Sequence, residues 1–246
     1  MTEEHTEKKN IKKNASEKDE KKDISETVQA QLDTTTAIKA GDFVSLDFVG
    51  ILKSTDTVFD TTKEDVAKAH GFNTERATYK PLIIKIGEGQ LLKALDDFLV
   101  GKKSGNYHLD LPAELAFGKK DAKLLRLISI GEFRKHEIAP QPGLEVELDG
   151  RRGIVRTVNG GRVIVDFNHP LSSQDISYDL TVNGVIADTA MKVEAVLGMF
   201  QLPFKSVKLE NNVATIALAT PIPAELTDTL KKEFIRLTGV ADILFQ

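Results

Sequence analysis

The sequence has no cysteine and no tryptophan among its 246 residues, and aromatic residues make up only 6% of it. The absence of cysteine excludes disulfides, thiolate zinc sites and cysteine nucleophiles. No continuous apolar run approaches the roughly 18 residues of a membrane-spanning helix. The N-terminal sequence MTEEHTEKKNIKKN also lacks the apolar core of a signal peptide. We therefore expect a soluble, cytoplasmic protein with no membrane partner.

Basic residues are not in excess either. The chain has 33 Lys and Arg against 37 Asp and Glu, a formal net charge of −4. Because nucleic-acid-binding proteins usually carry a basic field, we expect no nucleic-acid partner. The 5 histidines are scattered and form no i, i+4 pair, so we expect neither a metal site nor a cofactor. They are His5, His70, His108, His136 and His169.

The chain is long enough for more than one domain, and its composition changes along its length. Residues 1–35 are rich in Lys, Glu, Asp, Asn and Ser, with almost nothing to form a core, so we expect a disordered charged tail. After it, short apolar runs alternate with turn signals. Strands are expected at residues 43–49, 58–60, 82–86, 105–111 and 176–182, and helical segments at residues 63–69 and 90–100.

Residues 124–167, which we call the insert, have a different pattern. Three short strands at 144–148, 153–158 and 162–167 are separated by the turn signals Asp149-Gly150 and Asn159-Gly160-Gly161. This predicts a compact three-stranded meander, with a short helix at residues 131–136 before it.

Residues 184–246 are typical of a separate small α+β domain. Helices are expected at 192–201 and 223–237, and strands at 206–209, 213–219 and 240–245. The alternating Val213, Ile216 and Leu218 suit a buried sheet face. That face fits a self-contained core or the interface of a homodimer, and the sequence leaves both open.

Several motifs between residues 41 and 182 occur in a familiar order. They are Gly41-Asp42-Phe43-Val44-Ser45-Leu46-Asp47-Phe48, then Val58-Phe59-Asp60, then Gly87-Glu88-Gly89-Gln90-Leu91-Leu92-Lys93-Ala94-Leu95, then Leu111-Pro112 through Ala116-Phe117-Gly118, and finally Val165-Asp166-Phe167-Asn168-His169-Pro170-Leu171. In this order they resemble the FKBP-type peptidyl-prolyl isomerases, and most of all the SlyD-like subgroup and the long archaeal members.

The resemblance implies an α+β fold, in which a twisted antiparallel sheet wraps on a short helix. It implies a catalytic domain of residues 36–123 plus 168–183, interrupted by the insert at residues 124–167. In this family the inserted domain binds unfolded chains. The expected partners are therefore unfolded or nascent proline-containing polypeptides, and the long archaeal members carry a C-terminal domain that associates.

The chemistry of such an isomerase needs no acid–base triad. An X–Pro bond turns slowly because rotation breaks amide resonance, at a barrier of about 18–20 kcal/mol. The twisted amide is less polar than the planar one, so an apolar pocket can hold the twisted form better. The resemblance implies a pocket lined by Phe48, Phe59, Asp60, Leu91, Leu92, Leu95, Phe117 and Tyr178. Taken one at a time, the apolar residues of this set are more typical of an ordinary core than of a pocket, and only their joint match to the family motifs favours the pocket.

The chain departs from the family pattern at three of these positions. Phe48 and Phe117 stand where members often have Tyr, and Leu95 stands where they often have Trp. These departures favour isomerase activity over tight binding of macrolide inhibitors. His169 is expected to hold the junction between the insert and the catalytic domain.

The insert has apolar side chains expected either to pack its own core or to contact clients. They are Leu125, Leu127, Ile128, Ile130, Phe133 and Ile138. The leading hypothesis is therefore a prolyl isomerase with a client-holding insert. A holdase with a weakened isomerase pocket and a dimeric interaction scaffold remain the alternatives.

Overall fold

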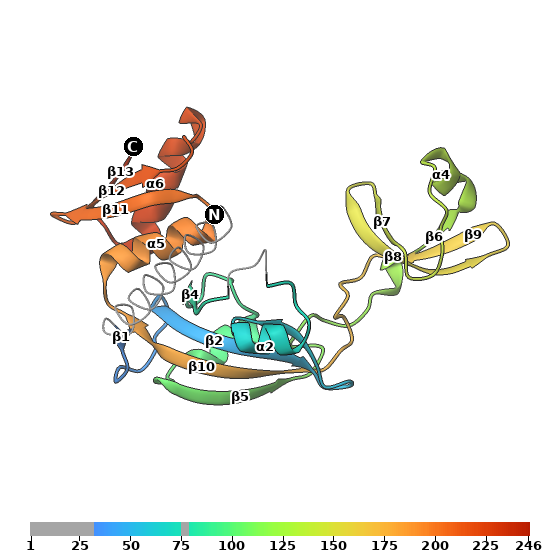
Figure 1. Cartoon of the computed structure of the whole chain (residues 1–246), viewed down its shortest axis with the longest axis horizontal. Helices are drawn as coiled ribbons and strands as arrows, with labels where there is room; N and C mark the ends of the chain where they lie inside the picture. Colours follow the sequence, from blue (N-terminus) through green and yellow to red (C-terminus); the bar gives the residue numbers. More distant parts are fainter. Residues whose placement is uncertain (1–31, 75–78) are drawn as a thin grey trace, which may run out of the picture. The chain divides into compact units, whose positions relative to one another are not determined.

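The computed structural model describes residues 32–74 and 79–246 (Figure 1). Of the predicted tail, residues 1–31 lie outside the described residues, and residues 32–35 lie within them. The chain divides into two compact units, each described by itself. One comprises the described residues up to Phe48 together with Thr61–Tyr107 and Leu180–Gln246, and the other comprises Val49–Asp60 and His108–Asp179. This division cuts across the predicted domain boundaries, because two long strands each begin in one unit and end in the other.

The main sheet has six strands in the order β1-β10-β2-β3, with β4 paired to β2 and β5 paired to β10. The strands are β1 (Leu32–Asp33), β2 (Phe43–Leu52), β3 (Thr57–Thr61), β4 (Leu82–Lys85), β5 (Gly105–Leu111) and β10 (Ile176–Ile186). β1 runs antiparallel to β10 and β4 antiparallel to β2, with Val44 opposite Ile84. All five predicted strands of this region are present, and β2 continues three residues beyond the predicted end.

Two short helices accompany this sheet, α2 (Glu64–Ala69) and α3 (Lys93–Leu99). The second begins later than the predicted residue 90. The side chain of Gln90 accepts a hydrogen bond from the Lys85 N–H at 2.7 Å, and Leu92 has the extended ψ of 137°. The residues before Lys93 therefore form a loop, in which the Gln90 side chain is hydrogen-bonded to the backbone of Lys85.

The insert forms a four-stranded sheet in the order β6-β9-β8-β7. Its elements are the 3₁₀ turn η1 (Ala122–Leu124), β6 (Leu125–Ser129), α4 (Ile130–Lys135), β7 (Glu145–Leu148), β8 (Arg151–Asn159) and β9 (Arg162–Asp166). The predicted three-stranded meander was incomplete, because β6 pairs antiparallel with β9 along its whole length. The run Leu125-Arg126-Leu127-Ile128 places apolar residues on both faces, so it gives no clean alternation.

The insert has its own core, and Phe133 of α4 is its largest fully buried side chain. The ring is 0% exposed and packs with Val146, Val155, Val163 and Val165. Of the two roles expected for these apolar residues, Phe133 has that of packing the core of the insert. Ile128, Ile130 and Ile138 are partly buried against the same core.

Asp166 at the end of β9 is a buried carboxylate with several donors. Its Oδ2 accepts from Lys120 Nζ at 3.2 Å and from Arg156 Nη2 at 3.0 Å, and its Oδ1 accepts from the Asn168 N–H at 3.0 Å. Burial by itself would raise the pKa of Asp166, but the hydrogen bonds from Asn168, Lys120 and Arg156 outweigh it and lower the pKa to about 2. The buried Asp166 carboxylate thus joins the insert to its flanking segments through hydrogen bonds and ion pairs.

The C-terminal segment forms a second small sheet, β11-β12-β13, with two helices. The elements are α5 (Thr189–Met199), β11 (Phe204–Glu210), β12 (Val213–Leu218), α6 (Ala224–Thr238) and β13 (Asp242–Phe245). The Asn211-Asn212 turn has positive φ at both residues, as a tight antiparallel connection requires. α6 ends at Gly239, whose φ of 75° suits glycine.

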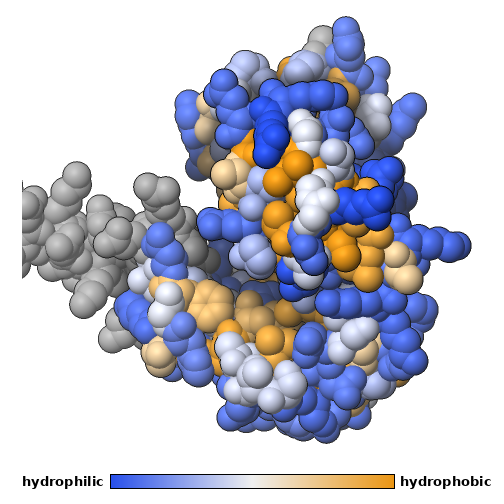
Figure 2. Space-filling model, turned by 90° about the vertical axis from the view of Figure 1, so that its right-hand side faces the viewer, coloured by the Kyte–Doolittle hydropathy of each residue, from blue (hydrophilic) through white to orange (hydrophobic). Residues whose placement is uncertain are grey.

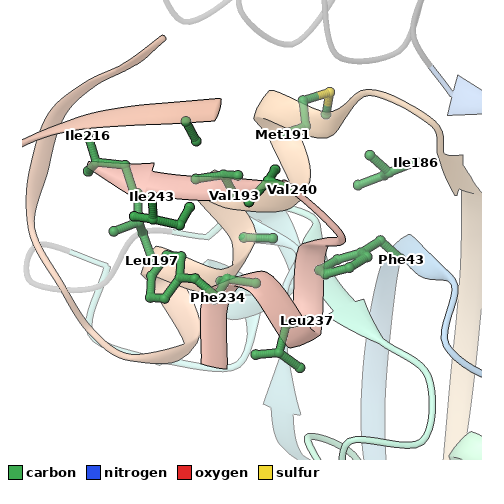
Figure 3. Close-up of a cluster of buried hydrophobic side chains, with 13 residues drawn as sticks. Phe43, Ile186, Met191, Val193, Leu197, Ile216, Phe234, Leu237, Val240 and Ile243 are labelled. Atoms are coloured by element: carbon green, nitrogen blue, oxygen red, sulfur yellow. The ribbon is translucent and has the colours of Figure 1, made fainter. Parts of the chain in front are cut away.

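The core of this segment is not separate from the main sheet. Phe43 of β2 and Ile186 of β10 are buried in the same cluster as Phe234 and Leu237 of α6 (Figure 3). Phe234 also contacts the rings of Phe200 and Phe245. The prediction of a separate C-terminal domain is therefore corrected: the sheet is its own, but its core includes the base of β2 and β10.

None of the helices between residues 32 and 74 or between 79 and 246 is long and apolar enough to cross a membrane.

The shared core gives the first stability prediction. Phe234→Ala should lower the free energy of unfolding by about 3–5 kcal/mol, because it removes a fully buried ring and leaves a cavity. The loss should also speed hydrogen exchange of the β2 amides, since Phe43 packs in the same cluster. Leu226→Ala on the same helix is the control: Leu226 is 52% exposed, so the loss should stay below about 0.5 kcal/mol. Unchanged β2 exchange in the Phe234 variant would refute the shared core.

Asp166 gives a prediction with a defined pH window. The folded-state pKa of Asp166, about 2, lies below the ordinary aspartate pKa of 3.8, so the ionised form stabilises the fold above about pH 4. That stability, up to about 2 kcal/mol, is lost as the pH falls toward 2. Urea unfolding between pH 2 and 5 should show a steeper rise with pH for the natural chain than for Asp166→Asn. Equal slopes would contradict the assignment.

Candidate active site

Three aromatic rings meet edge to face in the unit that contains residues 49–60 and 108–179. The Phe59 ring lies 5.8 Å from the Tyr178 ring and 6.1 Å from the Phe117 ring between centroids, at 81° in both cases. β3 supplies Phe59, β10 supplies Tyr178, and the loop after Pro112 supplies Phe117. Edge-to-face contacts of this kind are favourable beyond the area they bury. We call Phe59, Phe117 and Tyr178 the aromatic cluster.

The cluster depends on Gly50 of β2, which the sequence analysis did not single out. A Cβ at this position would lie 2.7 Å from Phe59 Cζ and 3.0 Å from Tyr178 Cε1. These distances are too short for a real side chain, so the two rings rest directly on the strand backbone. The signal available in the sequence was a glycine inside a strand pattern, which often marks such a close approach.

The polar groups beside the cluster are the Tyr178 hydroxyl and the Asp60 carboxylate. Burial raises the pKa of Tyr178 to about 12, and the negative charge of Asp60 contributes to the shift. The phenol therefore stays neutral throughout the physiological range. It is a hydroxyl in an apolar setting, with a carboxylate within electrostatic reach.

Phe117 is held in place by the segment that follows the insert. Its ring stacks on the His169 ring, with centroids 4.5 Å apart and planes 3° apart. Its carbonyl accepts from Ser172 Oγ at 3.4 Å, and the neighbouring Gly118 carbonyl accepts from the Ser173 N–H at 2.8 Å. His169 is thus placed at the junction, as predicted, and it also supports one ring of the cluster.

The other four predicted lining residues belong to the unit with residues 61–107. Phe48 of β2 is buried, and its carbonyl accepts from Thr61 Oγ1 at 2.9 Å. Leu95 is buried on α3, whereas Leu91 and Leu92 are half-buried in the loop before that helix.

The described residues contain no group of three or more His, Asp or Glu side chains placed to hold a metal ion. The arrangement of the aromatic cluster offers ring faces and edges, one neutral hydroxyl and one carboxylate. It can bury a small apolar group, but it presents no nucleophile paired with a base.

On the insert, Leu125 and Leu127 are exposed by 44% and 59% and alternate along β6, so they share one face of the sheet. Figure 2 shows that hydrophobic residues lie at the surface of the molecule among hydrophilic ones. Nearby, a cavity of about 410 Å³ is lined by Lys123, Leu124, Arg126, Asp149, Arg151 and Phe167.

Comparison with known families gives two matches on this chain. Residues 34–132 match the FKBP-type peptidyl-prolyl cis-trans isomerase family. Residues 126–171 match a family described as FKBP26, IF domain, which covers most of the insert.

Three individual proteins illustrate what the chain is similar to. The chain is 28% identical over 149 residues to the short-type peptidyl-prolyl cis-trans isomerase of Methanocaldococcus jannaschii, covering 60% of this chain and 94% of that protein. It is 33% identical over 109 residues to the FKBP-type 16 kDa peptidyl-prolyl cis-trans isomerase of Escherichia coli, covering 42% of this chain and 72% of that protein. The crystal structure of AtFKBP13 is 18% identical, with a TM-score of 0.31, over 61% of this chain and 82% of that chain.

The family match covers strands β2, β3, β4 and β5 of the main sheet and the loop before α3, and the Escherichia coli relative is matched over most of its length. With its curled antiparallel sheet and accompanying helices, the chain belongs to the FKBP-type peptidyl-prolyl cis-trans isomerase family and is an isomerase of that type.

Proposed function

We propose that this isomerase acts on X–Pro bonds of unfolded or partly folded proteins and receives the proline ring at the aromatic cluster. The observation that carries the proposal is the contact of Phe59 and Tyr178 with the bare backbone of Gly50. Ring walls of this kind exclude water from a small apolar group. Burial of the pyrrolidine methylenes then contributes about 0.8 kcal/mol each to binding.

The proposed catalysis is stabilisation of the twisted amide. Rotation about the X–Pro bond removes resonance and makes the amide less polar, so an apolar surrounding favours the twisted form over the planar one. The polar groups beside the proposed site are the neutral Tyr178 hydroxyl and the Asp60 carboxylate, whose charge can orient the amide dipole. No bond is made or broken, and no proton needs to be transferred.

The proposed pocket also includes Phe48, Leu91, Leu92 and Leu95. Their assignment rests on the family motif that each occupies in the sequence. Leu91 and Leu92 form a loop edge where a backbone N–H would hold a substrate carbonyl. Phe48 and Leu95 supply apolar wall and floor, in keeping with a site built for shape and desolvation.

The insert is proposed to hold the unfolded client. Leu125 and Leu127 give it an exposed apolar strip on β6, which a chain with unburied apolar residues would cover. Ile128, Ile130 and Ile138 are partly buried against the core of the insert. A holdase with a weakened isomerase pocket is the competing function, and the same exposed strip favours it.

Two further expectations remain predictions. The C-terminal segment exposes Leu226 on α6 and Leu244 on β13, which gives a homodimer an apolar surface to use. The protein's mass in dilute solution distinguishes a dimer from a monomer. A cytoplasmic location is expected from the sequence alone.

The first activity prediction concerns the aromatic cluster. The natural chain should accelerate cis-to-trans relaxation of a proline tetrapeptide, and Gly50→Ala should lower kcat/KM by about tenfold or more, because the added methyl group displaces the two rings. Gly198→Ala in α5 is the matched control: its Cβ meets nothing within 4 Å, so activity should be unchanged. No acceleration by the natural chain would refute the isomerase pocket and leave the holdase.

The second activity prediction separates the insert from the pocket. The double substitution Leu125→Ser and Leu127→Ser should leave tetrapeptide relaxation unchanged, because both side chains lie on the insert surface. Acceleration of a proline-limited protein refolding reaction should fall several-fold, because the client loses its apolar contact. The control is Leu115→Ser, which removes an exposed leucine outside the insert. Refolding activity equal to that of the natural chain would exclude client holding by this strip.

A further inference from the structure

The loop before α3 is bonded to the last turn of α6. Arg236 Nη1 donates to Glu88 Oε1 at 3.0 Å, and Arg236 Nη2 donates to Glu88 Oε2 at 2.9 Å. The pair is bidentate, the geometry in which a guanidinium holds a carboxylate most firmly. Glu88 lies between Gly87 and Gly89, both with positive φ, so the backbone on either side has little stiffness of its own.

A second cation joins the same helix end to the same loop. Lys85 Nζ donates to the Leu237 carbonyl at 3.0 Å and lies 3.7 Å from Glu88 Oε1. A helix leaves its last carbonyls without partners inside the helix, and a positive charge near them is favourable. The side chain is largely buried and lies over the Phe43 ring, 5.9 Å from the ring centroid. The contact is therefore continuous with the shared core.

The opposite side of the loop is held by α3. Asp96 is buried, and burial raises the pKa of its carboxyl while hydrogen bonds from the Gly87 and Gly89 backbone oppose that rise. The Gln90 side chain accepts from the Lys85 N–H at 2.7 Å. The loop thus has fixed partners within the catalytic sheet, and Glu88 reaches from it to the C-terminal segment.

We propose that Arg236 and Glu88 form a clamp by which the C-terminal segment positions Leu91 and Leu92 for isomerisation. Both are positioning residues, since neither reaches the proline itself. The proposal rests on the proposed function, in which Leu91 and Leu92 edge the pocket. It assigns the C-terminal segment a role in the isomerisation of small proline-containing peptides. This role is separate from any association between chains.

The test combines activity with a direct measure of the loop. Arg236→Gln and Glu88→Gln should each lower kcat/KM for a proline tetrapeptide by about threefold to tenfold, the size expected of a partly exposed bidentate pair. Hydrogen exchange of the amides at residues 87–92 should become faster in both variants. The double variant should lose no more than either single one, because both remove the same contact.

Two further variants separate the clamp from general damage. Glu233→Gln removes the other partner of Arg236, which lies 2.9 Å away on α6, and leaves the contact with Glu88 intact. It should keep the natural kcat/KM and the natural loop exchange. The charge-reversed pair Glu88→Arg with Arg236→Glu should recover part of the activity lost in the single variants.

The outcomes are distinguishable. Unchanged activity in both single variants would overturn the proposal, whether or not loop exchange rises. A loss as large in Glu233→Gln would also overturn it, because that variant keeps the clamp. An inactive natural chain would refute the proposed function instead, and loop exchange in the variants would still decide whether Arg236 holds the loop.

Discussion

The aromatic cluster depends on one steric constraint, the absence of a side chain at Gly50. With a Cβ only 2.7 Å from Phe59 Cζ, any other residue would push that ring off the strand and away from Tyr178 and Phe117. Edge-to-face contacts are worth about 0.5–1.5 kcal/mol each beyond buried area, so the rings keep a fixed arrangement. The same dry setting keeps the Tyr178 phenol neutral. A surface of this kind suits a reaction whose transition state is less polar than its ground state.

Phe117 also meets a second requirement, because it lies where the chain leaves for the insert. The His169 ring covers it from the returning segment, and Asn168 and Asp121 bond reciprocally just beyond, at 2.8 and 3.1 Å. The two chain ends of the insert are thus held together, which explains how a small domain can be inserted here without a large entropic cost. A displacement of these ends would move the backbone that carries Phe117. The insert and this ring of the cluster are therefore mechanically linked.

The sequence predicted most elements wherever a local pattern decided the structure. The alternation in β5, the Asn211-Asn212 turn and the glycine stop of α6 are of this kind. The features that were not predicted from the sequence depend on contacts between residues that are distant along the chain. β6 is a strand because β9 pairs with it, and the contact between Glu88 and Arg236 joins positions 148 residues apart. The site was predicted from the order of family motifs, whereas Gly50 is needed only because two rings from other strands pack against it.

The departures from the family pattern can be interpreted in terms of these contacts. At Phe117 a plain phenyl ring stacks flat on His169, and its position is set by that stack and by backbone hydrogen bonds. A hydroxyl is therefore not required to hold the loop that carries Phe117. At Leu95 the side chain is buried on α3, next to the buried Asp96 that faces the loop. With fewer polar groups at these positions, recognition in the proposed pocket depends on Tyr178, Asp60 and the loop backbone. Such a site recognises the backbone and the proline ring of a polypeptide. It has few polar side chains that could hydrogen-bond a larger small-molecule ligand.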